Sequence, residues 1–318
     1  MRKLSFLALL IFLLNACTDF TTDREIEAAL RVDIAYLADD KLEGRAIGTQ
    51  GEKLAAAYIV EAFERIGLEP KGTEGYYQSF KANPTNAANS AGVEGKNVVG
   101  YINNEAAQTV VIGAHYDHLG FGSEGSLYRG ERAVHNGADD NARGTAAMIQ
   151  LATLLKDKSD NFNYLFLAFS GKENGKWGSG FYTNNATVDL STINYMINLD
   201  MVGRLNAEIE LHLSGVGTSP IFSENIRLAN ADSLQLITLA SGTGPSDHAS
   251  FYAKNIPVLH LNTGEHEDYH RPGDDADKIN YKGLVKIVRF TERLIEELDE
   301  EAKLAFTKTK DQPIANSG

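Results

Sequence analysis

The chain has 318 residues, enough for one large domain or two small ones, and 43% of them are apolar, which supplies a sizeable hydrophobic core. A formal net charge of -13 disfavours nucleic acid as a partner, because phosphate groups require clusters of Lys and Arg. The single cysteine, Cys17, excludes an intramolecular disulfide.

The N-terminal segment predicts export and lipid attachment. Two basic residues precede an apolar run over residues 4–14, which is too short to span a bilayer as a helix. The run ends in Leu14-Asn15-Ala16-Cys17, which resembles a bacterial lipobox, where a peptidase cuts before the cysteine and the sulfur carries diacylglycerol. We therefore expect a lipoprotein signal peptide over residues 1–16 and a lipid-anchored domain in the bacterial cell envelope. Because Thr18 rather than Asp follows the cysteine, the outer membrane is the expected location. An ordinary secretory signal with a chance cysteine is the alternative.

Helical and extended patterns alternate along the rest of the chain. After a polar tether over residues 17–24, apolar residues recur at helical spacing over residues 26–37 and 55–66, and Gly67 predicts the end of the second helix. Short apolar runs then predict buried strands, with helices between them. The strands are expected at residues 97–102, 109–114, 164–169, 195–199 and 256–261, and the helices at 142–155, 219–231 and 281–298.

This alternation predicts an α/β fold, with a single domain over residues 25–306 built on a mostly parallel central β-sheet flanked by helices. Residues 84–95 are expected to form a loop, and residues 307–318 a loose polar tail. Ligands bind beyond the carboxyl ends of the strands in such sheets, so polar clusters at these points mark the candidate site.

Five polar clusters lie at these points. His115-Tyr116-Asp117 ends a strand, and an imidazole ligand beside an orienting carboxylate is chemically sensible. Asp139-Asp140-Asn141 opens a helix, so it fits a helix cap as well as a ligand. Lys172-Glu173 and Asp200 follow two further strands, and a carboxylate buried at a strand end requires a partner such as a cation. The fifth cluster, over residues 266–272, is by itself more typical of a structural histidine.

Together the clusters supply histidine and carboxylate ligands but no cysteine. Nitrogen and oxygen ligands suit a hydrolytic zinc site rather than a structural one. A site with this many carboxylates is able to hold two metal ions, which clamp and activate one water molecule.

The chain resembles the di-zinc aminopeptidase family, which also contains glutamate carboxypeptidase-like enzymes and glutaminyl cyclases. The resemblance covers roughly residues 28–300 and rests on the order and spacing of its motifs. These motifs are Leu42-Glu43-Gly44-Arg45, His115-Tyr116-Asp117, Asn136-Gly137-Ala138-Asp139-Asp140-Asn141, Asn198-Leu199-Asp200-Met201-Val202-Gly203, Ser246-Asp247-His248-Ala249-Ser250-Phe251 and Asp268-Tyr269-His270-Arg271-Pro272. It implies the zinc exopeptidase fold and an aminopeptidase that releases N-terminal residues from peptides, with two Zn²⁺ or other divalent ions activating a water.

The resemblance also implies a role for individual residues. His115 and Asp200 would bind one zinc, Glu173 and His270 would bind the other, and Asp140 would bridge the two. Asp117 would hold the His115 ring, while Asp247 and His248 would border the substrate pocket. The peptide bond between Asp140 and Asn141 is expected to be cis.

The chain departs from the family at the position of the general base. The family has two glutamates where this chain has Lys172-Glu173, so the zinc ligand is kept and the proton acceptor is not. General-base assistance contributes about 10²- to 10⁴-fold, and an ammonium group has no lone pair. Four explanations stay open. Lys172 loses its charge beside the zinc ions and acts as the base; its side chain turns outward; the chain is a catalytically impaired metal- or peptide-binding lipoprotein; or the residue is engineered or erroneous.

Two further departures affect the pocket, since Lys176-Trp177 stands where the family more often has aliphatic residues and Arg143 replaces a small residue. Two other activities of the same fold also stay open. A carboxypeptidase would need an arginine for the terminal carboxylate, for which Arg143, Arg204 and Arg271 are candidates. A glutaminyl cyclase would convert N-terminal glutamine and usually works with one zinc.

Overall fold

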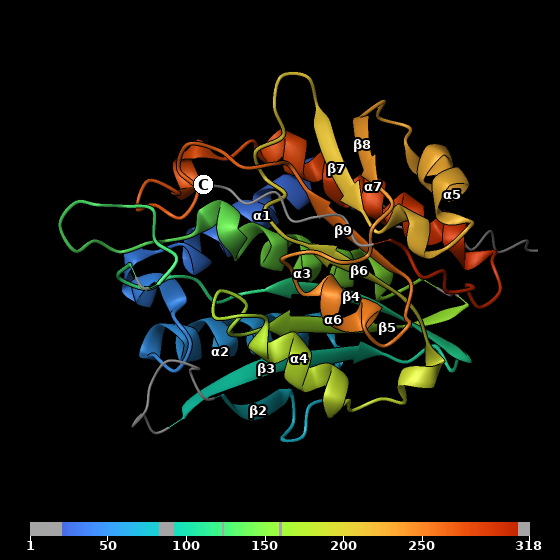
Figure 1. Cartoon of the computed structure of the whole chain (residues 1–318), viewed down its shortest axis with the longest axis horizontal. Helices are drawn as coiled ribbons and strands as arrows, with labels where there is room; N and C mark the ends of the chain where they lie inside the picture. The colour runs from blue at the N-terminus through green and yellow to red at the C-terminus, as the bar shows by residue number, and fades with distance from the viewer. Residues whose placement is uncertain (1–20, 83–91, 123, 159–160, 311–318) are drawn as a thin grey trace, which may run out of the picture.

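One mixed β-sheet runs through the domain, from β2 and β3 at one side to β7 and β8 at the other (Figure 1). The computed structural model describes residues 21–82, 92–122, 124–158 and 161–310. The predicted signal peptide and Cys17 lie outside the described residues. The strands are β1 (Glu69–Pro70), β2 (Tyr77–Ala82), β3 (Val93–Ile102), β4 (Gln108–His115), β5 (Phe162–Phe169), β6 (Ile193–Leu199), β7 (Glu210–Ser214), β8 (Gln235–Leu239) and β9 (Val258–Asn262).

The centre of the sheet is parallel. Strands β5, β4, β6 and β9 lie side by side in this order and run in the same direction. On the two sides of this block, β3 pairs antiparallel with β5 and β7 pairs antiparallel with β9. Every residue of β5 and β6 is buried, as is usual for parallel strands covered on both faces. The predicted α/β domain with a mostly parallel sheet is confirmed.

Helices cover both faces of the sheet. Helices α1, α2, α3 and α7 pack together on one face, and α4 and α6 lie on the other, in front of the strands in Figure 1. The alternation of a strand is visible in β5, where Tyr164 and Phe166 belong to the first core and Leu165 and Leu167 to the second. The helices are α1 (Asp23–Leu37), α2 (Gln50–Ile66), α3 (Arg143–Leu155), α4 (Trp177–Asn184), α5 (Phe222–Ala229), α6 (His248–Tyr252) and α7 (Tyr281–Asp299), with short helical turns η1 (Asp40–Arg45), η2 (Ala138–Ala142), η3 (Leu190–Thr192), η4 (Val216–Thr218) and η5 (Ala276–Lys278).

Three predicted boundaries need correction. Helix α1 begins at Asp23, inside the predicted tether, because Thr22 and Glu25 form a capping box. The predicted loop over residues 84–95 ends too late, because β3 begins at Val93 and pairs with β2. The tail that was expected to be loose from residue 307 is held at its start, where the Thr307 amide donates to the Thr218 carbonyl at 2.8 Å.

The sequence patterns missed the peripheral elements β1, β2, β7, β8, α4 and α6. Strand β8 has mostly exposed residues and therefore no alternation, and α6 spans 5 residues, too few to show a helical period. Within the described ranges, no helix is both long and apolar enough to cross a bilayer. Helix α2 ends as predicted, with Gly67 in the left-handed conformation at φ 83°.

Candidate metal centre

The parallel strands deliver the predicted site residues to one edge of the sheet. Strand β4 ends at His115, β5 is followed by Lys172 and Glu173, and β6 is followed by Asp200. His270 comes from the loop after β9. Because β5, β4, β6 and β9 run in the same direction, their carboxyl ends meet, and the turn η2 adds Asp140 between them.

One group of ligand atoms forms around His115. Its Nε2 atom lies 3.1 Å from Asp140 Oδ1 and 3.2 Å from Asp200 Oδ1, and all three residues are buried. The other ring nitrogen, Nδ1, lies 3.2 Å from the carbonyl oxygen of Asp117 and 3.5 Å from its carboxylate. Contacts to Nδ1 hold the ring with Nε2 directed at the two carboxylates.

A second group forms around His270 and shares Asp140. His270 Nε2 lies 3.1 Å from Asp140 Oδ2 and 3.4 Å from Glu173 Oε2. His270 Nδ1 lies 2.8 Å from the Gly125 carbonyl oxygen, so it donates there and leaves the Nε2 lone pair free. The structure therefore brings together all five predicted ligands, with the two oxygens of Asp140 facing the two histidines.

These separations fit a metal ion. A tetrahedral zinc ion with bonds of about 2.0–2.1 Å keeps its ligand atoms about 3.3 Å apart. Apart from each other, at 3.1 Å, Asp140 Oδ2 and His270 Nε2 have no hydrogen-bond partner among the described residues, although buried polar atoms are nearly always satisfied. The residues present thus fit a divalent cation.

His118 is a site residue that the sequence analysis missed. Its Nδ1 atom lies 3.6 Å from Glu173 Oε1 and 3.9 Å from Asp140 Oδ2, so that these three residues form a possible ligand group. Both of its ring nitrogens are buried and lack hydrogen bonds to any part of the chain that the structure describes. The signal in the sequence was its place in His115-Tyr116-Asp117-His118, directly after a predicted ligand pair.

Lys172 points into the centre rather than outward, which removes one of the explanations for this residue. Its Nζ atom lies 3.2 Å from Glu173 Oε1, 3.4 Å from Asp140 Oδ1 and 3.6 Å from Asp200 Oδ2. The carboxylate of Asp117 accepts the backbone N–H groups of Lys172 and Glu173 at 3.2 and 3.4 Å, so it also fixes the turn that carries them.

The carboxylates make the centre strongly attractive to positive charge. Without a metal ion, burial lowers the pKa of His270, but the adjacent carboxylates of Asp140 and Glu173 outweigh burial and raise it to about 10, so that Nε2 carries a proton which a metal ion would displace. Burial likewise opposes the charge on Lys172, yet the surrounding carboxylates hold its pKa well above the ordinary value. The same negative potential favours a divalent cation.

Buried polar contacts hold the loop that carries Asp140. The Arg45 guanidinium is fully buried and donates to the carbonyl oxygens of Leu37, Tyr116, Asn136 and Gly137. The buried Asp274 carboxylate accepts the N–H groups of Asp139 and Asp140, at 2.9 and 3.0 Å.

Asn141 ties this loop to the ends of β4 and β6. Its side-chain amide donates to the carbonyl oxygens of His115 and Leu199 at 3.2 and 2.9 Å. The peptide bond between Asp140 and Asn141 is cis, as predicted.

A cavity of about 520 Å³ opens beside the centre. Lys172, Lys176, His260 and Tyr269 are among the residues that line it. The predicted pocket residues Asp247 and His248 lie behind this wall and are fully buried, with the His248 ring stacked on His260 at 4.5 Å. Their expected position at the border of the pocket needs correction, because both side chains are fully covered and neither lines the cavity.

The candidate arginines for a terminal carboxylate are used elsewhere. Arg143 is buried and pairs with Asp139 at 2.9 Å, and Arg204 pairs with Asp268 at 2.9 Å. Arg271 donates to the Leu127 carbonyl at 2.9 Å. None of the three lines the cavity beside the centre.

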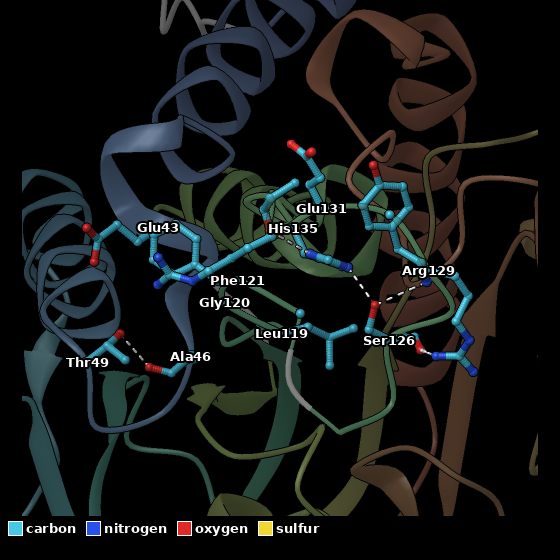
Figure 2. Close-up of a pocket in the computed structure, with 15 residues that line it drawn as sticks. Glu43, Ala46, Thr49, Leu119, Gly120, Phe121, Ser126, Arg129, Glu131 and His135 are labelled. Carbon is cyan, nitrogen blue, oxygen red and sulfur yellow. Dashed lines mark hydrogen bonds between the residues drawn. The ribbon is translucent and has the colours of Figure 1, made fainter.

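A separate cavity of about 640 Å³ lies between Glu43, Thr49 and the loop over residues 119–135 (Figure 2). In this loop Ser126 Oγ lies 2.8 Å from His135 Nε2. The same loop contacts the metal centre from its other side, because Gly125 holds His270 and the Leu127 N–H donates to the His270 carbonyl at 3.1 Å.

Comparison with known proteins gives a family for this arrangement. The model of Peptidase family M28 matches residues 97–295. Aminopeptidase YwaD of Bacillus subtilis is 27% identical over 187 residues, which cover 55% of this chain and 38% of that protein. The matched segment therefore spans less than half the length of that relative.

Solved structures share the fold. A leucine aminopeptidase precursor from Bacteroides thetaiotaomicron superposes with a TM-score of 0.70 at 15% identity, covering 86% of this chain and 97% of that one. A glutaminyl cyclase from the same organism has a TM-score of 0.70 at 16% identity, again covering 86% and 97%. Two different activities thus occur on this fold, and the fold by itself does not distinguish between them.

Proposed function

The chain belongs to peptidase family M28, and from that premise we propose that it is a metal-dependent aminopeptidase that releases N-terminal residues from peptides. The observation that carries the proposal is the pair of ligand groups around His115 and His270, which share Asp140 and adjoin an open cavity. When bound, divalent metal ions polarise the scissile carbonyl and lower the pKa of a water molecule.

The residues of the chain favour an amine over a carboxylate at the reacting end of the substrate. Carboxylates of Glu173 and Asp200 reach the cavity beside the centre, and Glu265 also lines it. Of these, Glu265 is not a metal ligand and attracts a free amino terminus, but Lys172 and Lys176 line the same cavity, so the engagement of the three candidate arginines is the stronger argument against a terminal carboxylate. Arg143, Arg204 and Arg271 already pair with other groups of the chain, so none of them is available to bind the terminal carboxylate that a carboxypeptidase recognises.

A second candidate function rests on Lys172. Its ammonium group lies within 3.6 Å of three carboxylates and has no lone pair with which to take a proton from water. General-base assistance is worth about 10²- to 10⁴-fold. The rival proposal is therefore a lipoprotein that binds metal or peptide with impaired catalysis.

A product assay on the detergent-solubilised full-length chain separates these functions. The native chain and Lys172→Glu are loaded with zinc and incubated with N-terminal amino-acid amides, with a peptide that begins with glutamine, and with an N-acetylated peptide. Asp140→Asn serves as the inactive control. Release of free amino acids by the native chain supports the aminopeptidase.

Each other outcome has a distinct meaning. Formation of pyroglutamate without release of residues indicates a cyclase, and cleavage of the acetylated peptide from its C-terminus indicates a carboxypeptidase. A silent native chain with an active Lys172→Glu variant supports the impaired binding protein. Silence of both chains with bound metal contradicts the aminopeptidase proposal.

We also propose that the enzyme is anchored in the outer membrane of a bacterium through lipid on Cys17, with its domain outside the cytoplasm. The lipobox-like residues 14–17 support this location. Metabolic labelling with an alkyne fatty acid is expected to mark the native chain and not Cys17→Ala. Labelling of both chains, or recovery of the native chain in the cytoplasm, would refute the anchor.

A further inference from the structure

We propose that Lys172 takes the place of one of the two divalent cations, so that the centre binds a single metal ion, on its His270 side. The inference rests on the metal dependence in the proposed function but not on peptidase turnover. It concerns the number of ions and their position, and both are measurable in a protein without activity.

The position of the ammonium group is the first argument. Lys172 Nζ contacts one oxygen from each ligand carboxylate, at 3.2 Å for Glu173, 3.4 Å for Asp140 and 3.6 Å for Asp200. It therefore lies between the two ligand groups, and its side chain is only 10% exposed. The backbone of the turn is also held, because the Lys172 carbonyl accepts the N–H groups of Gly175 and Lys176 at 2.9 and 3.0 Å.

The charge of the centre is the second argument. Asp140, Glu173 and Asp200 contribute three negative charges among the ligands. The charge of the fourth buried carboxylate, Asp117, is offset by the nearby buried guanidinium of Arg45. The ammonium group and one divalent ion balance these charges, whereas two divalent ions beside the ammonium leave an excess of two positive charges. An unbalanced charge in a buried site is costly, so the second ion is excluded while Lys172 is present.

The unsatisfied atoms indicate which side keeps the ion. Asp140 Oδ1 contacts both Lys172 and His115, and His115 Nε2 already has Asp200 Oδ1 at 3.2 Å. On the other side, both ring nitrogens of His118 are buried without hydrogen bonds within the described ranges, and Asp140 Oδ2 and His270 Nε2 face each other at 3.1 Å. Glu173 Oε2 completes this group, 3.4 Å from His270 Nε2.

Metal stoichiometry tests the inference. Full-length native chain, Lys172→Glu and Lys172→Met are stripped with a chelator, titrated with Zn²⁺ in detergent, and examined by native mass spectrometry and elemental analysis. We expect one zinc per native chain and two per chain in both variants. Lys176→Met is the matched control, because Lys176 lines the same cavity without contacting a ligand carboxylate, and it should keep one zinc.

The side of the centre is tested with Co²⁺, whose visible absorption reports its ligands. Removing a residue that only contacts a ligand typically weakens metal binding by about 10- to 100-fold, so we expect that range for His115→Ala and a loss of more than about 100-fold for His270→Ala. Equal losses, or a larger loss in His115→Ala, would overturn the assignment of the side.

Two tightly bound ions in the native chain, or one ion in both Lys172 variants, would overturn the substitution of Lys172 for a metal ion. If circular dichroism shows that a variant does not fold, the number of zinc ions bound by the native chain still tests the inference. One ion with no turnover keeps this inference and contradicts the aminopeptidase. Two bound ions in a native chain that turns over substrate would contradict this inference and support the aminopeptidase.

Discussion

Replacing Arg45 by methionine is expected to destabilise the domain strongly, because one buried side chain satisfies four carbonyl oxygens. The guanidinium has no exposed surface and donates to Tyr116 at 2.7 Å, Asn136 at 2.7 Å and Gly137 at 3.1 Å, as well as to Leu37. A hydrogen bond from a charged donor contributes about 1.5–3 kcal/mol, and a buried acceptor left without a donor costs about 1–3 kcal/mol.

The net loss is smaller than the sum of these bonds. Methionine fills much of the space, and removing the guanidinium also removes the cost of burying its charge, which already lowers the pKa of Arg45 to about 10. We therefore expect a loss of about 3–5 kcal/mol in the free energy of unfolding, close to that seen when one partner of a buried charged network is removed.

Urea denaturation followed by the fluorescence of Trp177, the one tryptophan in the chain, measures this loss. The chelator EDTA is present throughout, so that metal binding does not contribute. Arg31→Met is the matched control, because Arg31 is 54% exposed, pairs with Glu27 on the same helix and lies over the Tyr281 ring, which predicts a change of at most about 1 kcal/mol. A loss below about 1 kcal/mol for Arg45→Met, or one equal to the control, would refute the reasoning.

Substitutions at Lys172, Asp247 and Gly44 test three other parts of the structure. Lys172→Met should lower the free energy of unfolding in EDTA by about 3–5 kcal/mol, because it leaves the three carboxylates without a compensating positive charge. Added zinc should restore the stability of this variant. Equal unfolding midpoints of the variant with and without zinc would contradict this prediction. Burial raises the pKa of Asp247 to about 6, so the folded chain keeps this carboxyl group protonated at a pH where the unfolded chain has ionised it. The stability that the protonated group provides is therefore fully present below pH 3.8 and is lost as the pH rises through 6. Asp247→Asn should therefore gain up to about 3 kcal/mol relative to the native chain between pH 4 and pH 8 in urea titrations, and a difference that does not change with pH contradicts it. Gly44→Ala and Gly75→Ala share a positive φ, but a Cβ at Gly44 would lie 2.4 Å from a backbone oxygen and one at Gly75 would meet nothing within 4 Å. The Gly44 variant should thus melt at a clearly lower temperature than the Gly75 variant, whose cost is about 1–2 kcal/mol, and equal melting temperatures would exclude the crowding.

Local patterns in the sequence predicted the central strands of the sheet and the polar clusters at their ends, and the resemblance to the family gave the individual ligand roles. Buried strands such as residues 164–169 are recognisable in the sequence as continuous apolar runs. Polar residues lie at the ends of such runs, as His115 does for β4 and Asp200 for β6. Because parallel strands end at one edge, the order of these residues along the chain was sufficient to predict that they meet. The identity of Lys172 was also visible at once as a departure at the base position.

Tertiary structure decided what the side chains do once they meet. Whether Lys172 faces inward depends on carboxylates from three separate segments of the chain, and no local pattern encodes their common field. His118 joins the centre because the loop after β4 turns back toward Asp140 and Glu173. Asp247 and His248 matched a motif yet are fully buried behind the cavity wall, since the burial of these residues is set by the segments that pack over them rather than by their own sequence.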